Sequence, residues 1–183
     1  VLTPGLVRWG RRFHEGGDRL QEPPPPLPPY EDEEAPVQAL VVGAGPVGRQ
    51  VTSQLECSGV DVCVIDLSPV NLHEFEVLGI RTVAGDASDP HVLRRAHAAD
   101  AGVCVVCVPS DDVAMKIVKT ARRENPHMQI VVRCRYLANV PRLKTAGAAH
   151  VVSEESEAAA VLVEYLQRRV HRSAPQPEAA RGA

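Results

Sequence analysis

The sequence predicts an α/β protein with a doubly wound sheet of about six parallel strands between two layers of helices. From residue 37 onward, short apolar runs alternate with helix-forming segments of about ten residues. Within these runs apolar and polar residues do not alternate, which is typical of parallel strands that are covered on both faces. A glycine-rich segment follows the first apolar run directly and opens the first helix. Together these observations predict a three-layer α/β/α fold with right-handed crossovers.

Each expected element follows from its own stretch of sequence. Apolar runs predict six strands, at residues 37–42, 60–65, 81–84, 102–108, 129–134 and 150–152. Helical patterns predict helices at residues 46–58, 70–78, around Val92 and Leu93, 113–124, 138–146 and from 154 to about 171. The body is therefore expected to span residues 37–153, followed by a C-terminal helix at 154–172 and a disordered tail at 173–183.

The first 36 residues cannot build a core. They contain the proline run Pro23–Pro29, which favours a semi-rigid polyproline spacer, and the acidic run Glu31–Glu34. We interpret the segment as a linker, with docking to an aromatic groove as the alternative for the prolines. Because the chain begins with Val, we expect it to be a piece of a longer protein.

Composition excludes several classes of function. Aromatic residues make up 3% of the 183 residues, too few for a stacking platform that binds single-stranded nucleic acid. The formal net charge of −3 disfavours non-specific binding to DNA. No apolar run reaches the roughly 18–20 residues that a membrane-spanning helix needs. The sequence therefore predicts no nucleic-acid partner and no membrane span in this chain.

The cysteines predict neither a disulfide framework nor a metal site. The count of five is odd, and most lie inside apolar runs, which is typical of buried thiols in a reducing compartment. Cys104 and Cys107 have the spacing of redox or zinc pairs, but an apolar run surrounds them, so we favour a core position. The seven histidines form no spacing that pairs a base with an orienting group. We therefore expect no metal and no catalytic residue.

Residues 43–48, Gly-Ala-Gly-Pro-Val-Gly, fit the G-x-G-x-x-G fingerprint of Rossmann-like dinucleotide-binding units. The first glycine allows the tight turn, the second lets the backbone approach a pyrophosphate, and the third lets helix and strand pack closely. Asp66 ends the next strand 23 positions after Gly43, where the fingerprint places the acid that binds the ribose hydroxyls. A carboxylate there repels a 2′-phosphate, so the pattern predicts NAD(H) or an adenine nucleotide rather than NADP.

Three further strand ends meet at the same edge of the predicted sheet. Gly85 and Asp86 follow the third strand, and Pro109 to Asp112 follow the fourth. Arg133 and Arg135 end the fifth strand on one face, where they are available to phosphates, to an acidic partner or simply to surface salt bridges. Ligands of doubly wound sheets bind at this carboxyl edge.

Residues 37–170 resemble the N-terminal nucleotide-binding lobe of the RCK/KTN domains, which regulate K⁺ conductance and transport. The resemblance rests on Val42–Arg49, Val64–Asp66, Gly85–Ser88, Val131–Tyr136 and Leu143–Ala148. The segment Ala146–Glu155 also resembles the closing strand of that family. Gly-Pro-Val-Gly-Arg and Arg-Cys-Arg-Tyr are most similar to the cytosolic C-terminal domains of Kef-type monovalent cation:proton antiporters. The start of the chain, Leu2–Arg12, resembles the cytosolic exit of such an antiporter's last transmembrane helix, so residues 1–36 become a membrane-proximal segment and linker.

The resemblance implies a regulatory, non-enzymatic domain that binds NAD(H), AMP, ADP or ATP at the cytoplasmic face of the inner membrane and controls a cation transporter. It also implies a homodimer that uses the sheet edge and the last helix. The apolar stripe of this helix contains Val161, Leu162, Tyr165 and Leu166, and the same stripe would otherwise cover its own sheet. Carried over by position, the implied ligand-binding residues are Gly43, Ala44, Gly45, Pro46, Val47, Gly48, Asp66, Leu67, Asp86, Ala87, Val108, Ser110, Asp111 and Arg133.

Two departures from the family pattern narrow the expectation. Many members place an arginine or an aromatic residue in the glycine loop, where this chain has Ala44 and Pro46, so a triphosphate clamp is not expected. No second RCK lobe follows residue 171 in this sequence, so we expect no ligand site of that lobe. Two alternatives remain: a small NAD-dependent dehydrogenase, and a nucleic-acid module based on the eight basic residues between 116 and 144. A basic flank facing an anionic membrane leaflet explains those residues equally well.

Overall fold

The computed structural model describes residues 39–173, with the side chains of residues 39–170. Its sheet has six parallel strands in the order β3-β2-β1-β4-β5-β6, which confirms the predicted doubly wound fold. The strands are β1 (Ala39–Val42), β2 (Val62–Asp66), β3 (Arg81–Ala84), β4 (Val103–Val106), β5 (Gln129–Cys134) and β6 (His150–Ser153). Residues 37 and 38 of the first predicted strand, the linker before them and residues 174–183 of the predicted tail lie outside the described residues.

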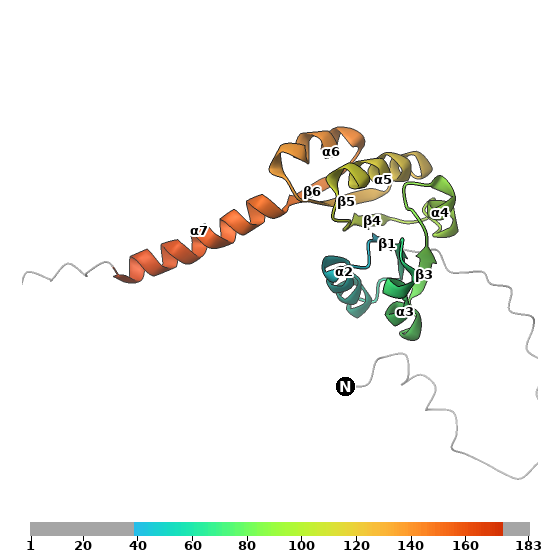
Figure 1. Ribbon diagram of the computed structural model, residues 1–183, viewed down its shortest axis with the longest axis horizontal. Helices are drawn as coiled ribbons and strands as arrows, with labels where there is room; N and C mark the ends of the chain where they lie inside the picture. The colour runs from blue at the N-terminus through green and yellow to red at the C-terminus, as the bar shows by residue number, and fades with distance from the viewer. Residues whose placement is uncertain (1–38, 174–183) are drawn as a thin grey trace, which may run out of the picture. The chain divides into compact units, whose positions relative to one another are not determined.

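Helices cover both faces of the sheet (Figure 1). One layer contains α2 (Pro46–Cys57) and α3 (Pro69–Val77), and the other contains α4, α5 and α6. The remaining bounds are α4 (Pro90–Arg95), α5 (Asp111–Glu124), the 3₁₀ turn η1 (Leu137–Asn139), α6 (Val140–Ala146) and α7 (Glu154–Ser173). The chain crosses from one helix layer to the other after β3. The segments that follow the paired strands β1 and β4 therefore run to opposite faces of the sheet and leave a crevice at the carboxyl ends of these strands.

Alternate strand residues point into two separate cores. Leu40 and Val42 pack in the larger core beneath α4, α5 and α6, whereas Val41 packs with Leu72 and Phe75 beneath α2 and α3. All five of these side chains are at most 4% exposed. This burial on both faces explains why the strands read as unbroken apolar runs in the sequence.

Several predicted boundaries move by one or two residues, and two of these moves lie at the crevice. The strand predicted for 102–108 ends at Val106, although the Cys107 N–H still donates to the Val42 carbonyl at 2.8 Å, and Val108 lies beyond the strand. The helix predicted to start at Val113 starts at Asp111, because the Ser110 hydroxyl caps it by accepting the backbone N–H of Val113 at 3.4 Å.

Helix α7 leaves the sheet after β6 and points away from the body (Figure 1). Every side chain from Glu157 to Val170 is exposed. The apolar stripe of α7 therefore does not cover its own sheet: Val161, Leu162, Tyr165 and Leu166 are each 58–64% exposed. Within residues 39–173, no helix combines the length and apolar character needed to cross a membrane.

Candidate functional site

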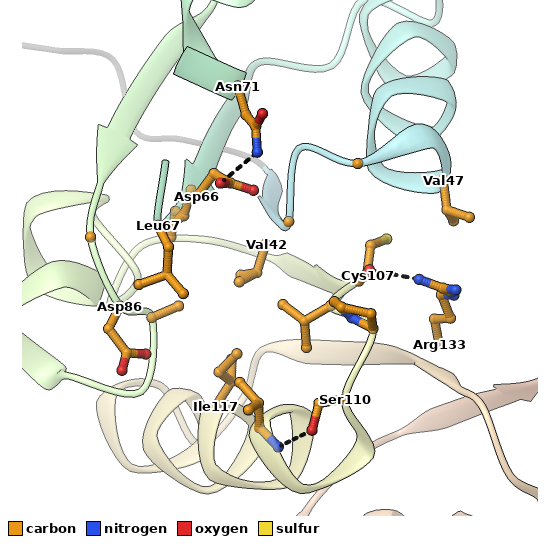
Figure 2. A pocket seen from close by; sticks show the side chains of 18 of the residues that line it. Val42, Val47, Asp66, Leu67, Asn71, Asp86, Cys107, Ser110, Ile117 and Arg133 are labelled. Carbon is orange, nitrogen blue, oxygen red and sulfur yellow. Dashed lines mark hydrogen bonds between the residues drawn. The ribbon is translucent and has the colours of Figure 1, made fainter. Parts of the chain in front are cut away.

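A cavity of ≈ 550 Å³ opens at the carboxyl edge of the sheet, between the ends of β1, β2 and β4 (Figure 2). Its size lies within the range of small-molecule and cofactor pockets. Apolar side chains make most of its wall, and a few polar groups converge on it. The lining residues are Val42, Gly43, Gly45, Pro46, Val47, Ile65, Asp66, Leu67, Asn71, Gly85, Asp86, Ala87, Cys107, Val108, Pro109, Ser110, Val113, Ile117 and Arg133.

The glycine loop forms one rim of the cavity, and its three glycines meet different surroundings. Gly43 has a φ of +101°, which favours glycine, and a Cβ there would lie 3.2 Å from the carbonyl carbon of Cys107. A Cβ on Gly48 would lie 1.8 Å from the Gly43 carbonyl oxygen, so Gly48 is required for packing α2 against the loop. Gly45 has nothing within 4 Å of its Cβ position. The open space at Gly45, directly before the first turn of α2, is a cradle beside unpaired backbone N–H groups.

Asp66 joins the glycine loop to the second strand. Its Oδ2 accepts the backbone N–H of Ala44 at 2.7 Å, and its Oδ1 accepts the backbone N–H of Ser68 at 2.8 Å and the amide of Asn71 at 3.1 Å. A carboxylate has about four lone-pair positions, so one remains after these three bonds, beside the cavity. The side chain is thus fixed in place and still able to accept a hydroxyl.

The wall opposite Asp66 comes from α5 and from the turn after β3. Val113 and Ile117 lie one helical turn apart and both face the cavity, and Ala87 is buried beside them. Asp86 stands on the rim, where its carboxylate accepts the backbone N–H of Ser88 at 2.8 Å. Between Asp66 and this wall the cavity is lined mainly by apolar side chains, with the carboxylates of Asp66 and Asp86 at its edge (Figure 2). We call this part of the cavity the apolar slot.

Most of the predicted binding residues lie on this cavity, but three do not line it. Ala44 is 1% exposed and uses its N–H on Asp66, and Gly48 lies behind the loop as a packing residue. Asp111 was expected to border a ligand, but it does not line the cavity. Its carboxylate accepts the backbone N–H groups of Arg135 at 2.7 Å and Tyr136 at 3.1 Å, and so anchors the turn after β5.

The Asp111 carboxylate predicts an acid-dependent loss of stability. Burial raises its pKa, but hydrogen bonds from the Arg135 N–H, the Asn139 amide and the Tyr136 N–H outweigh burial, so the pKa is lower than usual. A lowered native pKa stabilises the fold above the unfolded value of about 3.9, and this stabilisation is lost as pH falls through the native pKa. Asp111→Asn should cost about 1–3 kcal/mol at pH 7, and the gap to the unmodified chain should narrow below about pH 4. Urea unfolding from pH 7 to pH 2.5 measures the free energy of unfolding of the variant and of the unmodified chain. If the difference between them does not depend on pH, the stabilising role of the Asp111 carboxylate is contradicted.

Arg133 and Arg135, which were expected on one face, have separate roles. Arg133 lines the cavity, donates from Nη1 to the Cys107 carbonyl at 3.2 Å and forms an ion pair with Glu154. It therefore both meets the cavity and makes a salt bridge. Arg135 is exposed, and its guanidinium lies 5.3 Å from the Tyr136 ring centroid, away from the cavity wall.

The cysteines are thiols, and four of the five are buried; the fifth, Cys57, is exposed where it ends α2 at the surface. Burial raises the pKa of Cys104 to about 12 and that of Cys107 to about 11. Such thiols hold their protons at neutral pH, which disfavours thiolate chemistry. Among the residues that the structure describes, no group of three or more His, Cys, Asp or Glu side chains is placed to hold a metal ion.

Sequence reasoning missed part of the cavity wall. Asn71 lies in the first turn of α3 and Cys107 just beyond β4, and neither belongs to the fingerprint. The spacing of Val113 and Ile117 indicated that both side chains lie on one face of a helix, because residues four apart share a face. That face is also the core face, so spacing alone did not distinguish a cavity wall from core.

The family follows from a comparison of the whole body. The family model of the TrkA-N domain matches residues 39–154, which contain all six strands and the complete cavity. The chain belongs to the TrkA-N domain family. This TrkA-N domain thus confirms the resemblance seen in the sequence motifs.

Two relatives that are similar to this TrkA-N domain are named as transport proteins. “Putative cation/proton antiporter YbaL” of Escherichia coli K12 is 32% identical over 91% of this chain and 31% of its own length. “Glutathione-regulated potassium-efflux system protein KefC” of Salmonella arizonae is 30% identical over 70% of this chain and 20% of its own length. The chain thus spans about a third or less of these relatives.

Two solved structures have the same fold as this TrkA-N domain. The crystal structure of the TrkA-N domain of the inner membrane protein YbaL of Escherichia coli has a TM-score of 0.70, with 32% identity over 73% of this chain and 98% of that one. The Kef CTD of Shewanella denitrificans in its AMP-bound form has a TM-score of 0.61, with 25% identity over 70% of this chain and 78% of that one.

Proposed function

We propose that this TrkA-N domain binds NAD(H) or an adenine nucleotide such as AMP in the cavity above the glycine loop. The observation that carries the proposal is the pairing of Gly45 and Asp66 on one cavity. Gly45 leaves room for a phosphate at the start of α2, and Asp66 presents a fixed carboxylate suited to ribose hydroxyls. The apolar slot between Asp86 and Ile117 would take the adenine ring. The AMP-bound form of the similar Kef domain supports this assignment.

A regulatory role fits the cavity better than an enzymatic one. The described residues that line it include no histidine, lysine or tyrosine, and its one thiol has a raised pKa. General acid–base chemistry near neutral pH needs a group that titrates there. The cavity can therefore hold and orient a nucleotide, but it offers no proton carrier suited to dehydrogenase chemistry.

The proposed target of regulation is a monovalent cation transporter, with potassium or another cation exchanged for protons. YbaL and KefC, by their names, are transport proteins, and this chain matches only part of each. The proposed location is the cytoplasmic face of the inner membrane, since YbaL is named an inner membrane protein. Either α7 or the linker at residues 1–36 would transmit the effect of nucleotide binding to the transporter. In both cases the nucleotide changes transport only if it binds two arrangements of the domain with unequal affinity.

A second copy of this chain is the proposed partner of α7. The α7 stripe is exposed, and on the α2–α3 side of the sheet no described helix packs over β5 and β6, where Val131 and Val152 remain partly exposed. Each copy thus offers an apolar helix and an apolar sheet face that its own chain leaves open. Exchange of these surfaces between two copies would bury both.

Dimerisation predicts a clear effect of charge on the α7 stripe. Leu162→Glu combined with Leu166→Glu should convert a dimer into a monomer, because two carboxylates would be buried without partners. Light scattering coupled to size-exclusion chromatography measures the mass. Glu164→Gln, on the same helix, is the matched control and should remain dimeric. A dimer that persists in the double variant would contradict this interface.

Transport assays test the regulatory proposal. In vesicles that contain the full-length transporter, cation flux should change when NADH or AMP is added. Gly45→Ala should raise the AMP concentration needed for this change at least about tenfold, without altering the flux measured in the absence of nucleotide. Equal fluxes with and without saturating nucleotide would contradict a regulatory role.

A further inference from the structure

Arg133 connects the cavity to the base of α7. It is the second-last residue of β5 and lies on the cavity wall, on the side of Val47 in the first turn of α2 (Figure 2). Its Nη1 donates to the carbonyl of Cys107, which also packs against Gly43. Its Nε pairs with Glu154, the first residue of α7. One guanidinium therefore lies between the proposed phosphate end of the cavity and the start of the projecting helix.

The first turn of α7 is bonded to the body. Besides the Arg133–Glu154 pair, Glu155 accepts the backbone N–H of Leu137 at 2.8 Å, and the Ser153 hydroxyl accepts the N–H of Ser156 at 3.3 Å. Side chains from Glu157 onward are exposed. The direction of α7 thus depends on a few polar contacts, of which the pair with Arg133 is the one that reaches the cavity.

The pair is accessible and open to competition. Glu154 is 40% exposed and Arg133 27% exposed at their side chains. A pair this exposed contributes little, since water screens it. A phosphate group carries up to two charges and matches the planar fork of a guanidinium, so it competes with a single carboxylate for the same donors.

We propose that Arg133 couples the cavity to α7: a phosphate bound at the start of α2 draws Arg133 away from Glu154 and releases the first turn of α7. The inference rests on the proposed nucleotide binding and adds a route from the ligand to the helix. Linkage then requires the reverse effect, so loss of the Arg133–Glu154 pair strengthens the binding of phosphate-bearing ligands. Adenosine, which lacks a phosphate, is unaffected.

Calorimetric titration of the 183-residue chain with AMP and with adenosine tests this linkage. Glu154→Gln should bind AMP roughly two- to five-fold more tightly, the range expected from an exposed ion pair, and adenosine equally well. Glu155→Gln is the matched control, because its carboxylate holds Leu137 instead of Arg133, and it should change neither affinity. Matched melting temperatures confirm that the variants are folded.

A nitroxide spin label attached at Ala158→Cys, in a chain that also carries Cys57→Ser, measures the mobility of α7. It therefore tests whether a bound phosphate releases the first turn of α7. AMP should increase label mobility in the otherwise unmodified chain, adenosine should not, and Glu154→Gln should show the higher mobility without ligand. If Glu154→Gln does not change AMP affinity, or if Glu155→Gln increases AMP affinity by the same factor, the coupling is overturned. The proposed nucleotide binding is not affected by either result. Absence of AMP and adenosine binding to the unmodified chain would instead overturn the proposed function and the coupling with it.

Discussion

Asp66→Ala is expected to abolish stabilisation of the domain by NADH and AMP. At about 100 times its Kd a ligand adds about 2.7 kcal/mol to the free energy of unfolding. For a domain of this size that raises Tm by about 5–10 °C. Without the carboxylate, the ribose loses its acceptor and the glycine loop loses the bond that fixes the Ala44 N–H at 2.7 Å. Thermal-shift titrations measure the result.

Two comparisons separate ribose recognition from general damage. Asp61→Ala removes a carboxylate just before the amino end of β2, where it pairs with Arg81 away from the cavity, and should keep the full shift. NADPH should give little or no shift with the unmodified chain, because its 2′-phosphate would face Asp66. Equal shifts from NADPH and NADH would contradict the assignment of Asp66.

Gly48→Ala is expected to destabilise the fold by about 3 kcal/mol or more. The new Cβ would lie 1.8 Å from the Gly43 carbonyl oxygen, and this backbone atom cannot move without opening the loop. The corresponding fall in Tm is about 6–12 °C. Differential scanning calorimetry measures it directly.

Gly45→Ala is the matched variant in the same loop. Gly45 has a φ of −74°, which alanine adopts freely, and open space at its Cβ position, so stability should be unchanged. The added methyl group would occupy the phosphate cradle, so AMP affinity should fall at least about tenfold, the loss of roughly 1.4 kcal/mol. A stable Gly48→Ala or an unaffected AMP affinity in Gly45→Ala would contradict the roles assigned to these glycines.

The sequence predicts the parts of this molecule that depend on local pattern. Leu40, Val41 and Val42 lie on a strand buried on both faces, so the apolar run and the parallel sheet have the same cause. The turn at Gly43 and the acid at Asp66 are fixed by one supersecondary unit of strand, loop, helix and strand. Their spacing is therefore visible in the chain itself.

The rest depends on contacts between distant segments. Asp111 lies just after a strand end, as the proposed ligand-binding residues do. Its carboxylate instead accepts the backbone N–H groups of residues 24 and 25 positions later in the chain. Arg133 and Glu154 come from different elements, and no spacing rule relates them. The sequence pattern also does not determine the direction of α7, because an apolar stripe on a helix can pack on the helix's own sheet or on a partner.

The most direct test of nucleotide binding is a crystal structure of the chain grown with AMP. We expect the ribose at Asp66, the phosphate over Gly45 at the start of α2 and the adenine between Asp86 and Ile117. A cavity without ligand at saturating AMP, or AMP bound elsewhere on the domain, would contradict it.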